Sequence, residues 1–215
     1  MATSSSAPKG PTPVKITSPD FERRLALATA DDTAKGMFFN GVVQAVGKLV
    51  NAQAATTCLA AVGDRKFVDF FNYPIAWFLR LSFTAAELLA PAVGGHESAF
   101  RKLGMQATHD FLATGVGKTL LLLAGRDAKR LLTAVPGAFK TAVSYGERRV
   151  DFSGNGAGTL TMRRDFMPPA YHEGVLIAVL QAVGAKNVSV VGKAVGPLDA
   201  DYHLRWDPED EGGQS

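Results

Sequence analysis

The chain has little of what most catalytic and metal sites need. Cys58 is its only cysteine, so no internal disulfide can form and an oxidising compartment gains no support. Its four histidines, His96, His109, His172 and His203, lack the short spacings of a zinc site. A Ser/His/Asp motif is also missing from the sequence. We therefore expect a protein that is not an enzyme and that has neither a metal site nor a cofactor.

Long apolar runs are missing as well. The longest, such as 120–124, are far shorter than the ~20 residues that a membrane helix requires. The first twenty residues lack the continuous apolar core of a secretory signal peptide. These two features predict a cytoplasmic protein without a membrane span.

The two ends of the chain differ from its middle in composition. Residues 1–16 are rich in serine and proline and offer little to bury, and residues 207–215 contain four acids and no base. We expect a disordered leader over 1–16, a single α+β domain over 17–206 and an acidic disordered tail over 207–215. Without that tail the chain is more basic than its net charge of +3 implies.

The residues from about 147 to 206 show the clearest pattern. Val150 and Phe152 precede a Gly/Asn-rich stretch, 153–158, and Leu160 and Met162 follow it in the same period-2 alternation. Alternation on both sides of a glycine cluster predicts a β-hairpin.

A helix and two further strands are expected after this hairpin. Pro169 suits a first helical turn, the apolar positions then follow one helical face, and Gly184 ends the helix. Alternating apolar residues at 188–190 and 202–206 predict the two strands. The order is ββαββ.

The first 145 residues have the pattern of helices. Asp31, Asp32 and Thr33 offer N-caps for a helix that continues to Val50. Further helices are expected with Asn72 near the cap and Pro74 in the first turn, after the break at 91–95, and from Asp127 and Pro136, with a kink at Gly115 and Gly117. Helices followed by a segregated sheet make an α+β fold, with N-terminal helices packed on a small antiparallel sheet.

One segment looks like the end of a phosphate-binding loop. Residues 114–119 read Thr-Gly-Val-Gly-Lys-Thr, but the position that the full motif reserves for its first glycine is Leu112. A helical pattern precedes the segment, whereas a P-loop follows a strand. We expect no nucleotide site here.

The basic residues occur as scattered dyads, which favours solvated faces over a nucleic-acid surface. If the hairpin pairs Val150 with Met162, Arg149 faces Arg163 across the strands. Like charges directly opposite each other are destabilising, so nearby acids or an anionic partner must neutralise the pair. Arg149 and Arg163 are therefore a possible anion patch.

Four ionisable residues have both a functional and a structural interpretation. His109 is the best candidate for a haem ligand, but it lies beside Asp110 on the polar side of its helix. His172 and Glu173 fall in a first helical turn, where a solvated helix start is the simpler interpretation. Cys58, among small apolar neighbours, is expected to be a buried, inert thiol.

Aromatic residues are concentrated between positions 38 and 83. Adjacent phenylalanines at 38–39 and at 70–71 cannot all point into one core, because successive side chains turn apart. The surplus indicates a dimer interface or a ligand pocket. The candidate ligand-binding or interface residues are Phe38, Phe39, Phe70, Phe71, Tyr73 and Trp77.

A family resemblance rests on several segments. They include Lys35-Gly-Met-Phe-Phe-Asn-Gly, Phe70-Phe-Asn-Tyr-Pro, the run from Arg163 to Val175 and the closing Asp201-Tyr-His-Leu-Arg-Trp. These resemble an uncharacterised family of myxobacterial proteins, over about residues 21–206. The ββαββ end is more distantly similar to the 4-vinyl-reductase-like, haem/NO-binding-related and TRAPP-transport-subunit superfamily.

This resemblance implies helices against a small sheet, with dimers or an enclosed apolar ligand. The transport subunits can carry an acyl chain on a cysteine, and whether Cys58 matches that position stays open. We expect a sensor or adaptor that forms a homodimer and binds a protein partner. The alternative is a carrier or sensor with a small hydrophobic ligand, such as an acyl chain, in an apolar pocket.

Overall fold

The computed structural model describes residues 14–207, which form a two-part α+β fold. The helices are α1 (Pro19–Ala26), α2 (Gly36–Leu49), α3 (Ala52–Ala60), α4 (Ile75–Val93), α5 (His96–Ala113), α6 (Gly115–Ala124), α7 (Ala128–Ala142) and α8 (Pro169–Ala182). The strands are β1 (Thr33–Lys35), β2 (Asn72–Pro74), β3 (Glu147–Phe152), β4 (Ala157–Arg163), β5 (Lys186–Ala194) and β6 (Ala200–Asp207). The α+β class is therefore confirmed. The predicted disordered ends fall mainly on 1–13 and 208–215, outside the described residues.

The C-terminal half is a four-stranded antiparallel sheet covered by helices. Its strand order is β3-β4-β6-β5, with α8 in the connection between β4 and β5, so the predicted ββαββ order is confirmed. Leu160 and Met162 of β4 and Tyr202 and Leu204 of β6 are buried, while their neighbours in sequence are more exposed. This alternation gives the sheet one apolar face, against which α7 and α8 pack.

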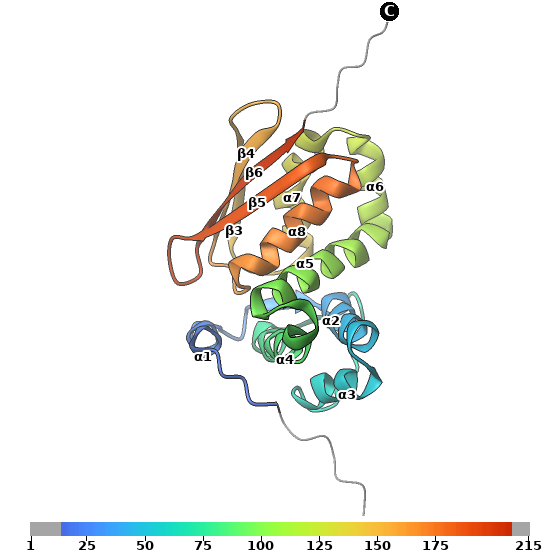
Figure 1. The fold of residues 1–215 in the computed structure, drawn as a ribbon, viewed down its shortest axis with the longest axis vertical. Helices are drawn as coiled ribbons and strands as arrows, with labels where there is room; N and C mark the ends of the chain where they lie inside the picture. The colour runs from blue at the N-terminus through green and yellow to red at the C-terminus, as the bar shows by residue number, and fades with distance from the viewer. Residues whose placement is uncertain (1–13, 208–215) are drawn as a thin grey trace, which may run out of the picture.

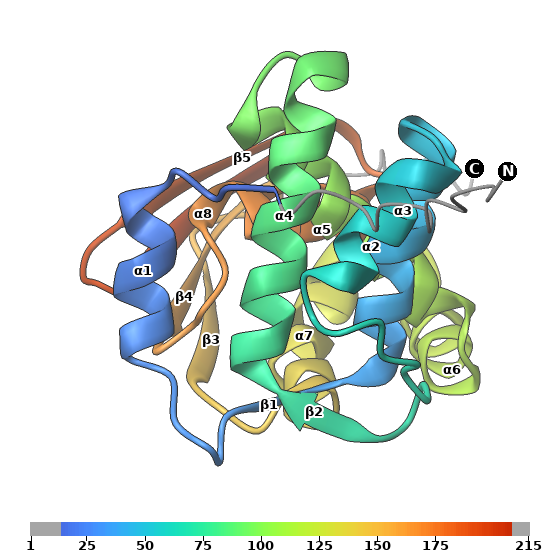
Figure 2. The ribbon, with the colours of Figure 1, turned by 90° about the horizontal axis from the view of Figure 1, so that it is seen from below.

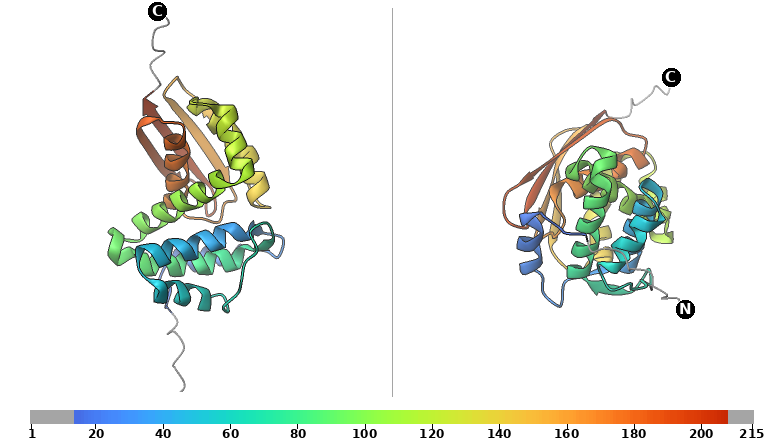
Figure 3. Two further views of the ribbon diagram at one scale, coloured as in Figure 1. Left: turned by 90° about the vertical axis from the view of Figure 1, so that its right-hand side faces the viewer. Right: turned by 60° about the horizontal axis from the view of Figure 1, so that its bottom comes forward.

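The N-terminal half is a separate helical layer. Figure 1 shows α1 to α4 below the sheet, and Figure 2, from below, shows α4 between α1 and α2. The left view of Figure 3 shows α5 between the two halves. Helix α5 contacts α2 and α4 on one side and α8 on the other, so it joins the helical layer to the sheet layer.

Two glycines allow α5 and α8 to approach closely. A Cβ on Gly104 of α5 would lie 1.8 Å from the Tyr171 carbonyl oxygen, and one on Gly174 of α8 would lie 1.9 Å from that of Arg101. Both distances are far below van der Waals contact, so only glycine fits at either position. The crossing fixes the first turn of α8, where His172 lies.

The register of the predicted hairpin was wrong by two residues. Val150 pairs with Leu160, so Arg149 lies opposite Thr161 and Arg163 lies opposite Glu147. The turn is tighter than expected because Gly158, assigned to the turn from its glycine content, pairs with Phe152 in the ladder.

The two arginines of the expected anion patch therefore do not face each other. Arg149 Nε lies 2.9 Å from Asp151 Oδ2, and Arg163 Nη1 lies 2.7 Å from Asp201 Oδ1. The anion patch stays a prediction without the pairing that motivated it.

Several helix boundaries also differ from expectation. Thr33–Lys35 forms β1, which pairs with β2, so α2 starts at Gly36 and is not capped by Asp31, Asp32 or Thr33. Pro74 precedes α4 as its N-cap residue and is not in its first turn.

The break expected at 91–95 does separate α4 from α5, but the helix start expected at Pro136 and the kink expected at Gly115 were wrong. Pro91 and Pro136 lie inside α4 and α7, and the kink is a full break between α5 and α6. Helix α7 continues past Pro136 because it buries an apolar face that includes Leu131, Leu132 and Val135. That burial outweighs the hydrogen bond that proline removes.

Within the described residues, α4 is the one helix long and apolar enough to cross a membrane. Eleven of its nineteen residues are buried inside the protein, where it packs against α2 and α5. This is the pattern of a central core helix, so the structure gives no clear membrane span.

Candidate ligand site

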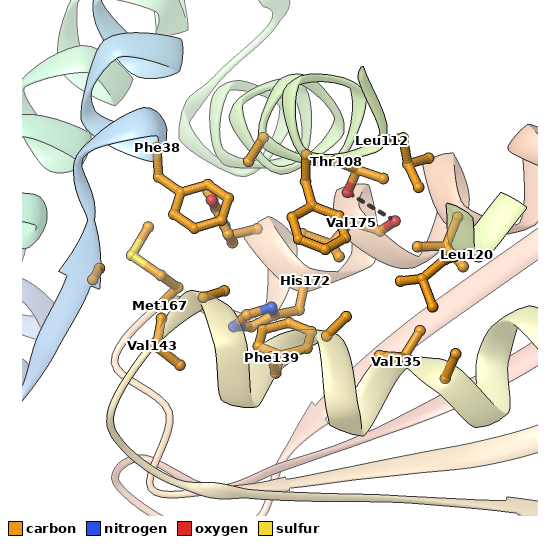
Figure 4. Close-up of a pocket in the computed structure, with 18 of the residues that line it drawn as sticks. Phe38, Thr108, Leu112, Leu120, Val135, Phe139, Val143, Met167, His172 and Val175 are labelled. Carbon is orange, nitrogen blue, oxygen red and sulfur yellow. Dashed lines mark hydrogen bonds between the residues drawn. The ribbon is translucent and has the colours of Figure 1, made fainter. Parts of the chain in front are cut away.

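An apolar cavity of about 100 Å³ lies between α5, α7 and α8. Phe38 of α2 and Leu120 of α6 close two of its sides, and Figure 4 shows the side chains pointing inward. Its aromatic lining residues are Phe38, Phe78, Phe111, Phe139, Tyr145 and Tyr171. A partly open apolar hollow with few polar groups is a common form of small-molecule site.

His172 brings a buried polar ring to the wall of this cavity. Its exposed fraction is 2%, and its Nε2 atom lies 2.6 Å from Oδ1 of Asp165. The ring packs 5.7 Å, centroid to centroid, from Phe139, and Figure 4 shows the two side by side. The prediction of a solvated helix start was wrong for His172.

Asp165 is held as a carboxylate by several donors. Arg148 Nη2 donates to its Oδ2, and the backbone N–H of Met167 donates to Oδ1 at 3.0 Å. Burial alone would raise the pKa of Asp165, but its interactions with His172 and Arg148 and the hydrogen bond from the Met167 N–H lower it well below its usual value. The carboxylate is thus ionised at neutral pH and can only accept hydrogen bonds.

One nitrogen of His172 has no protein partner. Nδ1 is buried and unpaired, whereas the hydroxyl of Thr108, the neighbouring polar group of the cavity, donates to Val175 at 3.3 Å. Among the unpaired buried polar atoms found in the described chain, it alone belongs to a residue that lines the cavity. A buried polar atom left unpaired costs roughly 1–3 kcal/mol, so this atom calls for an explanation.

The segment beside His172 is tied to the N-terminal helices. Arg24 of α1 is buried and donates through Nη1 to the carbonyl oxygen of Met167 at 3.2 Å. Arg164 donates through Nη2 to Asp32 Oδ2 at 2.9 Å, which connects the same segment to the start of β1.

The predicted aromatic residues separate into three groups. Phe39 is fully buried in the core, whereas its neighbour Phe38 lines the cavity. Phe70 and Phe71 are both on the surface, with exposed fractions of 73% and 64%. Of the six candidates, only Phe38 is therefore at the cavity.

Tyr73 and Trp77 belong to an aromatic cluster that includes Phe39. Phe39 stacks on Phe67 at 4.3 Å between centroids, Tyr73 lies 5.0 Å from Phe67, and Arg65 covers the ring of Trp77 at 3.9 Å. The cluster packs α2 against α4 and the segment before β2, and a binding role for Tyr73 and Trp77 stays a prediction.

The residues weighed for other chemistry lie away from the cavity. His109 is exposed, and Cys58 is fully buried in α3, where burial raises the pKa of its thiol to about 12. The P-loop-like segment joins two helices, and the Thr114 hydroxyl accepts from the Gly117 N–H at 3.1 Å as an N-cap. A P-loop follows a strand, whereas helix α5 precedes this segment, and the absence of nucleotide binding stays a prediction.

The sequence indicated that His172 is buried, but its place in a first helical turn obscured this signal. The residues that follow it, 174–180, are almost entirely apolar, so α8 is apolar on all sides. Such a helix is buried all round, and a polar residue within it must be buried too. Asp165 could not have been found this way, because it lies outside α8, in the segment between β4 and α8, and only the fold brings it to the ring.

A second, more polar hollow of about 420 Å³ lies between α1, α5 and the start of α8. Two of its acidic side chains already have partners. Glu173 binds Arg101 and the N–H of Gly192, and Asp20 binds Arg24 at 2.6 Å. These pairings make the hollow part of the packing between elements.

Solved structures with the same fold are H-NOX proteins. An H-NOX protein from S. oneidensis in the Fe(II) ligation state is 14% identical with a TM-score of 0.64, covering 82% of this chain and 98% of its own. The Fe(II) unliganded H-NOX protein from K. algicida is 10% identical with a TM-score of 0.65, covering 84% and 100%. An oxygen-binding H-NOX domain related to soluble guanylate cyclases, in its oxygen complex, is 14% identical with a TM-score of 0.60, covering 84% and 100%.

These likenesses show the fold. No curated protein sequence matches the chain.

The residues of the cavity do not fit a haem. Its volume of about 100 Å³ is well below the ~300 Å³ at which pockets for larger organic ligands begin, and a porphyrin belongs to that class. His109, the best candidate for an axial ligand in the sequence, is exposed, and His172 already uses Nε2 for Asp165. Among residues 14–207, no group of three His, Cys, Asp or Glu side chains could hold a metal ion.

A family model described as "Protein of unknown function (DUF2378)" matches residues 27–207. The match covers both the helical layer and the sheet, so it includes every element that builds the cavity. The myxobacterial source stays a prediction. The chain belongs to the DUF2378 family.

Proposed function

We propose that the chain is a non-enzymatic sensor or carrier domain that binds a small hydrophobic ligand in the cavity between α5, α7 and α8. The observation that carries this proposal is the partly open apolar cavity, which is lined by His172, a residue with an unpaired buried nitrogen. The fold likeness to H-NOX proteins, one of them an oxygen complex, supports a ligand-binding role for this fold.

Ligand binding can reach the rest of the protein through the segment 164–168. Its backbone accepts hydrogen bonds from Arg24 of α1, and Arg164 pairs with Asp32 before β1. A ligand that moves the His172 ring changes the position of Asp165, and with it these contacts. The proposal thus gives the domain a route from the cavity to its N-terminal helices.

The test combines native mass spectrometry with thermal unfolding. Purified protein should carry extra bound mass or, if the ligand is lost, gain stability from toluene as an apolar probe. A ligand at 100 times its Kd stabilises by about 2.7 kcal/mol. Val135→Phe, which fills the cavity, should abolish both effects, whereas Val191→Phe, the same change at an exposed position of β5, should preserve them.

Two results would contradict the proposal. One is a wild-type protein with neither bound mass nor stabilisation by toluene at its solubility limit. The other is equal binding by the Val135→Phe and Val191→Phe variants, which would place the probe outside the cavity. An absorption spectrum of the same sample tests the conclusion that the cavity does not fit a haem. A haem absorption band would overturn that conclusion.

A second candidate function is association through the surface around Phe70 and Phe71. These side chains are exposed together with Val68 in the segment before β2, and exposed aromatic clusters are typical of protein interfaces. We propose that this surface forms a homodimer or docks a protein partner, and that the protein acts in the cytoplasm.

A further inference from the structure

We infer that the ligand is a single-ring aromatic molecule with one hydrogen-bond donor, of the phenol class, whose donor binds His172 Nδ1. This inference rests on the proposed function and names the ligand chemistry of the same site. It follows from the size of the cavity, the shape of its walls and the proton on His172.

The size of the cavity limits the ligand to about one ring. An engineered apolar cavity of about 150 Å³ in another protein binds benzene, and the cavity here is about 100 Å³. Several lining side chains, including Phe38, Phe111 and Leu120, are only partly buried, so the wall can widen slightly. A long acyl chain or a fused ring system would need a much larger rearrangement.

The aromatic walls favour a flat ring. Phe38, Phe111, Phe139 and Tyr171 contribute ring surfaces from four different helices. Aromatic pairs in edge-to-face or offset geometry are stabilised by about 0.5–1.5 kcal/mol beyond the burial of their area. A ring inside the cavity can make several such contacts at once.

The position of the proton on His172 selects a donor over an acceptor. Asp165 is an ionised carboxylate and can only accept, so His172 must donate to it through Nε2–H. In the neutral imidazole the other nitrogen, Nδ1, then carries a lone pair and is an acceptor. The group that satisfies Nδ1 is therefore an O–H or N–H of the ligand.

The experiment compares phenol, toluene and anisole by calorimetry on the full-length wild-type protein. The three share a ring, but only phenol has a donor, and anisole has an acceptor oxygen alone. A hydrogen bond to a buried acceptor that is otherwise unpaired should make phenol bind about tenfold more tightly than toluene. Anisole should bind no better than toluene.

A spectroscopic measurement locates the bond without a variant. In ¹⁵N spectra of the wild-type protein, phenol should shift the Nδ1 resonance of His172, and toluene should leave it almost unchanged. His172→Phe, which keeps the ring but removes both nitrogens, should bind phenol and toluene about equally. If this variant does not fold, the ¹⁵N measurement on the wild type still decides the question.

The outcomes separate this inference from the proposed function. Equal binding of phenol and toluene, or phenol binding with an unmoved Nδ1 resonance, overturns the inference and preserves the cavity as a ligand site. Tighter binding of anisole than of phenol also overturns it, because Nδ1 would then be a donor. Binding of none of the three removes the proposed function itself.

Discussion

Asp165 holds together three segments of the chain that are distant in sequence. Its carboxylate binds Arg148 of β3 and His172 of α8, and its backbone carbonyl accepts from Arg24 of α1 at 3.4 Å. Both side chains of the Asp165–Arg148 pair are almost fully buried. Removing one partner from such a pair leaves an uncompensated charge in the interior.

Asp165→Asn should therefore destabilise the protein strongly. Loss of a buried partner costs about 3–5 kcal/mol, which corresponds to a fall in Tm of roughly 10 °C for a chain of this size. Asp151→Asn is the matched control, because Asp151 pairs with Arg149 on the surface and should change the free energy of unfolding by less than about 0.5 kcal/mol. Similar Tm values for the two variants would show that the buried network is not stabilising.

The same pair predicts how stability depends on pH. The pKa of Asp165 is lower in the folded protein than in the unfolded chain, where an Asp titrates near 3.9. The contribution of Asp165 to the free energy of unfolding is therefore present above a pH of about 3.9 and is lost as the pH falls below it. Thermal unfolding between pH 6 and 3 should show a smaller loss for Asp165→Asn than for the wild type, and parallel curves would contradict this assignment.

At the scale of elements, the crossing of α5 and α8 positions the site. Gly104 and Gly174 allow the backbones to touch, and Arg101 of α5 donates through Nε to Glu173 of α8 at 3.1 Å. Glu173 also accepts from the N–H of Gly192, which fixes α8 to β5. The first turn of α8 is thus held by two neighbouring elements, and the His172 ring is held with it.

Gly174→Ala should separate these two helices. The added Cβ would lie 1.9 Å from the Arg101 carbonyl oxygen, so we expect a loss of about 3 kcal/mol or more and weaker ligand binding. Gly137→Ala in α7 is the control, because its Cβ meets nothing within 4 Å. That change should stabilise by about 0.5–1 kcal/mol. Denaturant unfolding measures both, and a neutral Gly174→Ala would show that the helices can move apart at little cost.

The N-terminus of α6 should not bind nucleotides. Lys118 lies in the first turns of a helix that follows another helix, and the cap at Gly117 is made by Thr114. Lys118→Ala should leave ATP and GTP binding unchanged, at no measurable affinity in either protein. Micromolar nucleotide binding that disappears in this variant, measured by equilibrium dialysis, would contradict the assignment.

At the scale of the whole molecule, the exposed aromatics predict association. Phe70→Glu together with Phe71→Glu should give a folded monomer, because a carboxylate in a buried contact must be desolvated. Burial of each phenylalanine contributes about 1.5–3 kcal/mol, counted twice in a symmetric dimer. Phe39→Glu, inside the core, should instead unfold the protein. Sedimentation of the wild type as a monomer at micromolar concentration would remove the homodimer.

The sequence by itself determined the order and type of the C-terminal elements. Period-2 alternation, the proline at 169 and the glycine at 184 are local signals, and the structure has the strands and the helix where they predict. The helical character of the first 145 residues was equally local. The start of α2 and the hairpin register were missed, because they depend on the pairing of β1 with β2 and of Phe152 with Gly158.

Only the tertiary structure decided where the site lies. The aromatic candidates were chosen by composition, yet burial assigned Phe39 to the core, Phe38 to the cavity and Phe70 to the surface. His172 acquired its role from Asp165 and from the helices that surround it, none of which is adjacent to it in sequence. A cavity is the space that packed elements leave between them, so it exists only after α5, α7 and α8 have been brought together.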